Sequence, residues 1–294
     1  MSDFITVPNL PEAPVTLAAV CDDAAVTRAL RALGIETVSP VPDAALPEET
    51  KAHADLLLCH AGGSVCFVAP GQEALTERLR QEGFSVFFSA PPGAAYPEDI
   101  RLNVAVAKDF ALGRFDSVDA GLTAFLRSSG RKMIPVKQGY AKCSVCFVTD
   151  RAFITEDPSI AAALEKRGAD VLRITPGDIY LSERHYGFFG GASGKLGKDR
   201  LAVMGSLSAH RDGRRIRAFA ESHGVSIVEL TDGRITDIGG ILPLKEGFVA
   251  LKLNKSSRQS RVVSRQKSSG RSYGESGEEL FLTTAAQRAA SGDW

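Results

Sequence analysis

The stretch KCSVCFVTDRAFITEDPSIAAALEKRGADVLRITPG, residues 142–177, shows the unit from which this chain is built. Two apolar, strand-like runs come first. The next segment has the start and stop residues of a helix, with Asp157 as N-cap, Pro158 at the first helical position and Gly168 past the end. A third apolar run follows and ends at a Pro-Gly pair. The predicted order is therefore strand, strand, helix, strand.

The same order recurs along the chain. A helix-like stretch ends at a glycine and runs into a short apolar strand five times, at Gly34, Gly83, Gly130, Gly168 and Gly224. A repeat spacing that averages about 47 residues indicates a repeat architecture. A doubly wound sheet or an eight-fold barrel has one strand per helix, in units of about 25–35 residues. Five ββαβ units therefore fit better, and the remaining alternative is an irregular α/β domain whose glycines merely end helices.

The first unit lacks its first strand, whereas the segment DIGGILPL, residues 237–244, lacks a helix of its own. We expect this segment to complete the first unit, because closing the ring removes exposed sheet edges. The sequence thus predicts the α/β class, as a five-fold pseudosymmetric α/β propeller of ββαβ units over residues 1–246.

The remaining residues, 247–294, form a different kind of segment. They contain eight Lys and Arg against four Asp and Glu, with abundant Ser, Gln and Gly in the first half. Such a segment cannot bury enough apolar surface to fold alone, so we predict a disordered basic tail. The whole chain has a formal net charge of zero, which gives no electrostatic reason to expect a specific nucleic acid or a membrane as partner.

Five dispersed cysteines, an odd number, argue against a disulfide framework. No basic region precedes the first apolar stretch, and no apolar run approaches the roughly 20 residues of a membrane span. We therefore expect a cytoplasmic protein, and the sequence leaves its oligomeric state open.

Three segments carry a resemblance to a known family: VKQGYAKCSVCF (136–147), GFFGGASGK (187–195) and DIGGILPL (237–244). They resemble an uncharacterised bacterial family assigned to the pentein, or guanidino-group-modifying enzyme, superfamily. That superfamily includes arginine deiminases, dimethylarginine hydrolases and amidinotransferases, and the resemblance covers roughly residues 15–246. It implies the same five-unit fold.

The catalytic penteins have a cysteine nucleophile on the last central strand, after a glycine-rich stretch. Here that stretch is followed by Ile241-Leu242-Pro243-Leu244, and no cysteine occurs after Cys146. Proline has neither a nucleophile nor an N–H, so thiol chemistry cannot be carried out at that position. The resemblance therefore implies a protein that binds a small polar molecule, guanidino or amino-acid-like, in a central cavity without the usual cysteine chemistry and without a cofactor.

Four polar residues at the starts of the inner segments are the predicted ligand contacts. Asp55 would hold a cation, Asn103 would fix orientation and Lys137 would hold a carboxylate, and Asp237 is the second carboxylate. Structural alternatives remain open for both carboxylates: Asp55 as a cap at a strand end, and Asp237 as an Asx-turn before its glycine pair.

Cys143 is the candidate for a relocated nucleophile in a hydrolase or amidinotransferase, the first alternative function. The spacing Cys143-Ser144-Val145-Cys146 places the two thiols on opposite faces of a predicted strand, and no second Cys pair or His cluster follows. We therefore expect no metal site. A structural or interaction protein, with a centre filled by Tyr140, Tyr186 and Phe188, is the second alternative.

Overall fold

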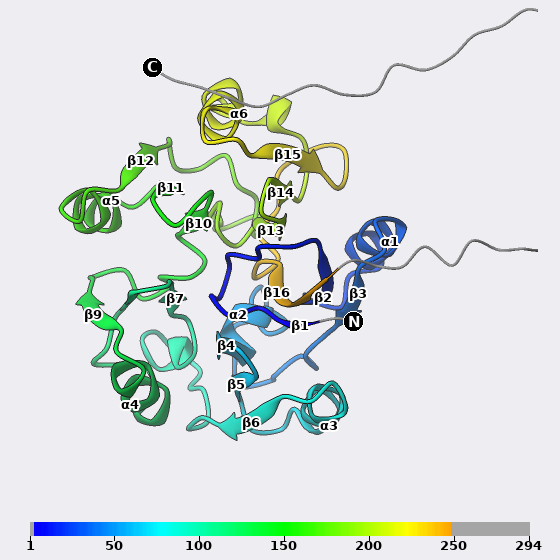
Figure 1. Ribbon diagram of the computed structural model, residues 1–294, viewed down its shortest axis with the longest axis vertical. Coiled ribbons are helices and arrows are strands. Elements are labelled where there is room, and N and C mark those ends of the chain that lie inside the picture. Colours follow the sequence, from blue (N-terminus) through cyan, green and yellow to red (C-terminus); the bar gives the residue numbers. More distant parts are fainter. Residues whose placement is uncertain (1–2, 248–294) are drawn as a thin grey trace, which may run out of the picture. The chain divides into compact units, whose positions relative to one another are not determined.

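Five small sheets surround a common centre in the computed structural model, which describes residues 3–247 (Figure 1). All of these residues belong to one compact unit, Met1–Ala250. The α/β class and the five ββαβ units predicted from the sequence are confirmed. Apart from Gly247, the predicted basic tail lies outside the described residues.

Each unit has an inner strand, a middle strand, a helix and an outer strand. The second unit consists of α2 (Ala54–Leu57), β4 (Leu58–Gly62), β5 (Val65–Val68), α3 (Glu73–Gln81) and β6 (Ser85–Phe88). The third contains η1 (Glu98–Ile100), β7 (Ala105–Val106), β8 (Phe110–Gly113), α4 (Ala120–Ser128) and β9 (Lys132–Pro135). The fourth contains β10 (Cys146–Phe147), β11 (Ala152–Thr155), α5 (Pro158–Glu165) and β12 (Asp170–Arg173). The fifth contains β13 (Ser193–Gly197), β14 (Arg200–Val203), η2 (Leu207–Ala209), α6 (Gly213–Ser222) and β15 (Ser226–Glu229).

The strand pairing is the same in these four units. The inner strand is antiparallel to the middle strand, and the middle strand is parallel to the outer strand that follows the helix. A parallel pair needs a long crossover, which the helix supplies. Figure 1 shows α3, α4, α5 and α6 at the periphery, with the inner strands closer to the centre.

The first unit is completed from the other end of the chain. It contains β1 (Asp3–Phe4), β2 (Val15–Ala19), α1 (Ala24–Ala32) and β3 (Glu36–Val38), and β16 (Leu242–Glu246) pairs antiparallel with β2 in the place of the missing inner strand. The expected ring closure is thus confirmed. Pro243 lies opposite Ala18, beside a register shift between Pro243 and Lys245, which is a position in a sheet where proline is tolerated.

Local sequence signals explain the helix boundaries. The side chains of Asp23, Asp119 and Asp157 accept hydrogen bonds from backbone N–H groups at the starts of α1, α4 and α5. At the far ends, Gly34 and Gly168 have φ values of 80° and 76°, which glycine adopts without a steric penalty. Each helix therefore stops where the outer strand must begin.

Two predicted strands are shorter than expected, and both differences affect the centre. The run 142–150 is a strand only at Cys146–Phe147, because Ser144 N–H and Val145 N–H bond to Tyr140 and Lys142 carbonyls in a turn. Residues 54–57 are helical rather than extended. In both places the backbone turns just before the inner strand, and these turns carry the polar residues described below.

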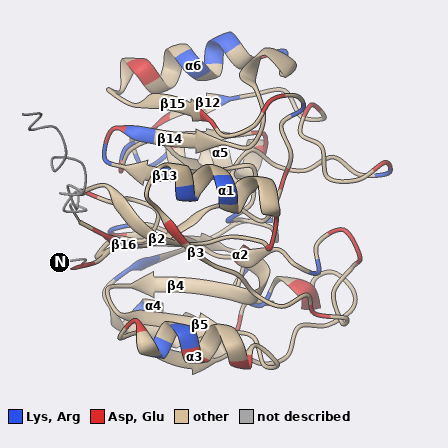
Figure 2. Cartoon of the chain, turned by 90° about the vertical axis from the view of Figure 1, so that its right-hand side faces the viewer, with Lys and Arg blue, Asp and Glu red and all other residues tan. Residues whose placement is uncertain are grey.

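Apolar residues fill the spaces between the sheets and their helices, for example Val26 and Leu30 of α1 and Leu75 and Leu79 of α3, all buried. Figure 2 shows Lys and Arg beside Asp and Glu on α3 and α6, so these two helices do not present a patch of one charge. Among the described residues, no helix has the length and apolar character of a bilayer-spanning segment.

Candidate functional site

A cavity of about 400 Å³ opens at the N-terminal ends of the inner strands. It is lined by Pro47, Glu49, Thr50, His53, Tyr140, Cys143, Leu181, Arg184, His185, Tyr186, Phe188 and Asp237. These residues come from the segments that lead into β4, β10, β13 and β16. The aromatic side chains of Tyr140, Tyr186 and Phe188 line the cavity and do not fill it.

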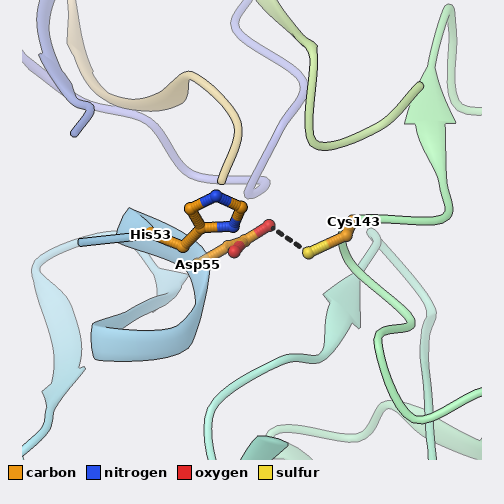
Figure 3. Close-up of side chains that lie close together, drawn as sticks. All are labelled: His53, Asp55 and Cys143. Atoms are coloured by element: carbon orange, nitrogen blue, oxygen red, sulfur yellow. Dashed lines mark hydrogen bonds between the residues drawn. The ribbon is translucent and has the colours of Figure 1, made fainter. Parts of the chain in front are cut away.

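Cys143 forms part of the cavity wall although its residue is only 3% exposed. Its thiol donates a hydrogen bond to Oδ2 of Asp55 at 2.9 Å, and the side-chain amide of Asn103 donates to its sulfur at 3.2 Å. Figure 3 shows Cys143 reaching the Asp55 carboxylate from a different segment, with the His53 ring beside that carboxylate. Burial, followed by the charges of Asp55 and Asp237, raises the pKa of the thiol well above its usual value. The sulfur is therefore protonated at neutral pH.

Asn103 holds this arrangement together and is fully buried. Its Nδ2 also donates to the backbone carbonyl of Asp55 at 3.2 Å, and its Oδ1 accepts from Lys142 N–H at 2.7 Å and from Cys143 N–H at 3.4 Å. The amide is thus occupied with protein groups from two other units. Its direct role is to position Cys143 and Asp55.

Asp55 lies in the helical turn of α2 and is 1% exposed. Its Oδ1 atom is buried and has no hydrogen-bond partner among the residues that the structure describes. Burial raises the pKa of Asp55 to about 6, while the charges of Lys142 and His53 act in the opposite direction. Lys142 is itself buried and donates from Nζ to the carbonyl of Gly190 at 3.3 Å.

Asp237 faces His53 across the cavity floor, with 3.8 Å between Oδ1 and Nδ1 of the imidazole. Its carboxylate also accepts the N–H groups of Phe188 at 2.9 Å and Gly239 at 3.0 Å. The second of these bonds forms an Asx-turn. A Cβ atom on Gly191 would lie 2.0 Å from Asp237 Oδ1, so the close approach of the glycine-rich segment depends on the missing side chain.

The structure brings three of the four predicted contacts together, namely Asp55, Asn103 and Asp237. Lys137 lies elsewhere: it is exposed and lines a separate depression with Arg114, Phe115 and Asp116. The buried cation near the carboxylates is instead Lys142, which was not among the predicted contacts. Lys142 adjoins Cys143 in a run predicted to be extended, and only the observed turn shows where its side chain goes.

Glu156 is a second group that sequence reasoning missed. It is 7% exposed, its Oε1 accepts Phe189 N–H at 2.8 Å, and its Oε2 has no partner within residues 3–247. Burial raises its pKa to about 8, with Asp237 adding to the effect. It is therefore largely a neutral acid at pH 7. A buried glutamate at the end of β11 has no signature in the sequence that distinguishes it from a surface glutamate.

A family model described as "Family of unknown function (DUF6873)" matches residues 21–242. The chain belongs to this family. The match contains the second to fifth units complete and part of the first, and it includes all of the site residues above. No curated protein of known function shows significant sequence similarity to the chain.

Solved structures share the fold of this DUF6873 member at low sequence identity. One is the inosamine-phosphate amidinotransferase of Streptomyces griseus, with a TM-score of 0.52, 12% identity, and coverage of 84% of this chain and 98% of that one. Another is the agmatine deiminase of C. jejuni, with a TM-score of 0.50, 8% identity, and coverage of 78% and 90%. The chain therefore has the pentein fold that the sequence resemblance implied.

Proposed function

We propose that this protein binds a small molecule with a guanidino or amino group in the central cavity. The observation that carries the proposal is a pair of buried carboxylates at a cavity with aromatic walls: Asp237 lines the cavity, and Asp55 lies directly behind the cavity-lining Cys143. The buried lysine that acts on these two carboxylates is Lys142, so the carboxylates outnumber the lysine. A ligand cation would balance carboxylate charge in a poorly solvated place, where electrostatic attraction is strong.

The shape and chemistry of the walls fit a guanidinium group. A planar guanidinium donates to a carboxylate in parallel bonds, and Asp55 Oδ1 is an acceptor without a partner among the described residues. The rings of Tyr140 and Phe188 line the cavity, and an aromatic ring attracts a cation that lies over its face. At the rim, the exposed Arg184 is the cation that would meet a ligand carboxylate, in the role predicted for Lys137.

A comparison of arginine with citrulline tests the proposal, because the two differ in the charge of the side-chain group. We expect arginine or agmatine at about 100 times its Kd to stabilise the protein by about 2.7 kcal/mol, a rise in Tm of roughly 5–10 °C. Citrulline should give a much smaller rise. Asp55→Asn should abolish the effect of arginine, whereas Asp116→Asn, at an exposed carboxylate outside the cavity, should not. If all ligands leave the Tm unchanged, the proposal fails.

A hydrolase or amidinotransferase that uses Cys143 is the second candidate. It is favoured by the hydrogen bond from the thiol to Asp55, which gives the sulfur a proton acceptor in place. The thiol proton would pass to Asp55, the sulfur would bond to the guanidino carbon, and an amine would leave with a proton. Release of ammonia or amine from arginine or agmatine, lost in Cys143→Ser and kept in Cys59→Ser, would establish this activity.

A location in the cytoplasm stays a prediction from the sequence.

A further inference from the structure

Three different metal-binding side chains meet beside the cavity, two of them, His53 and Cys143, in its wall. One donor atom each from His53, Asp55 and Cys143 lies within 4.8 Å of the other two, and all three residues are buried. His53 and Asp55 precede β4, and Cys143 precedes β10, so the group is assembled from two units of the ring. A surface cluster of carboxylates is common without a metal, but a buried set of nitrogen, oxygen and sulfur donors is not explained by solvation.

The donor types select among metal ions. Calcium and magnesium take oxygen ligands, whereas zinc takes Cys sulfur, His nitrogen and carboxylate oxygen in tetrahedral sites. Zinc–ligand bonds of about 2.0–2.3 Å place neighbouring donors about 3.5 Å apart. The Cys143–Asp55 pair at 2.9 Å would open by about 0.6 Å, and no pair would have to close by more than about 1.3 Å.

The surroundings also fit a bound cation. Asp55 Oδ1 is a buried oxygen without a hydrogen-bond partner in the described part of the chain, so this carboxylate has unused capacity as a ligand. Zinc bound to a thiolate and to one carboxylate is neutral overall, and the remaining charges nearby, Lys142 and Asp237, balance each other. Asp237 Oδ1, 3.8 Å from the imidazole of His53, is placed to orient that ring, as carboxylates do beside metal-bound histidines.

We propose that His53, Asp55 and Cys143 bind one zinc ion whose fourth coordination position opens into the cavity. The Zn–S bond replaces the S–H bond of Cys143, and the displaced proton goes to solvent. His53 and Cys143 line the cavity wall, so the open position would be accessible to water or to a small ligand. Three protein ligands with one open position are the arrangement of catalytic rather than structural zinc sites. This proposal differs from the sequence expectation of no metal site, and it does not depend on a guanidino ligand.

Cobalt(II) is the probe, since it replaces zinc and reports its ligands spectroscopically. The untagged full-length chain, freed of metal with a chelator and then dialysed, is titrated with Co²⁺ in the absence of oxygen. We expect saturation at one cobalt per chain, with visible bands of a tetrahedral site and a sulfur-to-cobalt charge-transfer band in the near ultraviolet. Zn²⁺ should displace the cobalt and release one proton per chain relative to the metal-free protein.

Matched variants identify the ligands. Cys143→Ser should remove the charge-transfer band, and Cys59→Ser and Cys146→Ser, at two other buried cysteines, should retain it. His53→Ala should weaken binding more than about 100-fold, because even outer-shell partners change metal affinity 10- to 100-fold. The His53 side chain makes no hydrogen bond within the described residues that this substitution would break. His53→Ala therefore still tests the zinc site if Cys143→Ser does not fold.

The absence of a saturable band, or a band unchanged in both Cys143→Ser and His53→Ala, would overturn the zinc site. This result is separable from the proposed function. Cobalt binding without any arginine-induced rise in Tm would reject only the guanidino ligand. An arginine effect in chelator-treated protein that binds no cobalt would reject only the zinc site.

Discussion

The sulfur of Cys143 lies 2.9 Å from Oδ2 of Asp55, although 88 residues separate the two in the sequence. The contact joins the second and fourth units across the centre of the ring. Neither residue belongs to a regular strand, and each is held by a backbone turn that Asn103 and Gly239 stabilise through hydrogen bonds. The site therefore depends on the closed arrangement of all units.

Asn103→Ala tests this dependence. The substitution leaves the carbonyl of Asp55 and the N–H of Lys142 buried without their present partner, and each such group costs about 1–3 kcal/mol. We expect a loss of roughly 3 kcal/mol in the free energy of unfolding in urea. Gln81→Ala on α3, where the side chain is exposed and donates to Glu77, should change it by less than about 0.5 kcal/mol. Equal effects of the two variants would contradict the role of Asn103.

Glu156 makes the stability depend on pH. Its pKa is about 8 in the folded protein against 4.5 for the free side chain, so the folded state binds the proton more tightly than the unfolded state does. The stability that the protonated Glu156 carboxyl allows the folded state is fully present below pH 4.5, and it is lost as the pH rises through 8. Glu156→Gln keeps the acceptor for Phe189 N–H and removes the titration. We expect the variant to be more stable than the wild type by about 2–4 kcal/mol at pH 8.5.

The measurement is urea unfolding of both proteins at a series of pH values from 4.5 to 8.5. The difference between them should be near its minimum at the acid end and grow toward alkaline pH. A difference that does not change with pH would show that the Glu156 carboxyl is ionised throughout this range.

Two glycines of β13, Gly194 and Gly197, test how closely the fifth unit packs against the segment that leads into β16, because only Gly194 lies against that segment. A Cβ on Gly194 would lie 2.1 Å from the carbonyl oxygen of Ile241, whereas a Cβ on Gly197 would meet no atom closer than 3.7 Å. Gly194→Ala should therefore destabilise the protein by about 3 kcal/mol through overpacking, and Gly197→Ala by less than about 1 kcal/mol. The measurement is the Tm of each variant in thermal unfolding. A lower Tm for Gly197→Ala than for Gly194→Ala would refute the close contact at Gly194.

The domain boundary predicted at residue 246 can be tested by shortening the chain. A chain that ends at Gly247 keeps β16, which pairs with both β1 and β2, and should have the Tm of the full-length protein within about 2 °C. A chain that ends at Ile241 loses the buried Leu242 and Leu244, each worth about 2–5 kcal/mol, and opens the ring. We expect it not to fold, as measured by circular dichroism.

The repeat pattern could be predicted from the sequence because its determinants are local. Asp157, Pro158 and Gly168 specify the start and end of α5 through contacts within a few residues, and the same signals recur at the other helices. Even the partner of the first unit could be inferred by elimination, since the segment from 237 to 244 was left without a helix.

The site could not be predicted to the same extent. Asp55 and Cys143 were expected on extended strands, where side chains alternate between two faces. Alternation along a strand does not show whether Lys137 or Lys142 lies near the carboxylates. The turns at residues 54–57 and 140–145 are stabilised by long-range hydrogen bonds with the Asn103 side chain and the Gly239 carbonyl, which override the local preference.

The sequence by itself thus determined the units, their order and the position of the ring closure, because short-range capping and alternation of apolar residues specify them. Only the tertiary structure decided which polar side chains meet. His53, Asp55, Asn103, Cys143 and Asp237 come from four segments, and their separations depend on how the five units close around the centre. How closely the units approach one another at the centre is a property of packing between units, which no local pattern in the chain encodes.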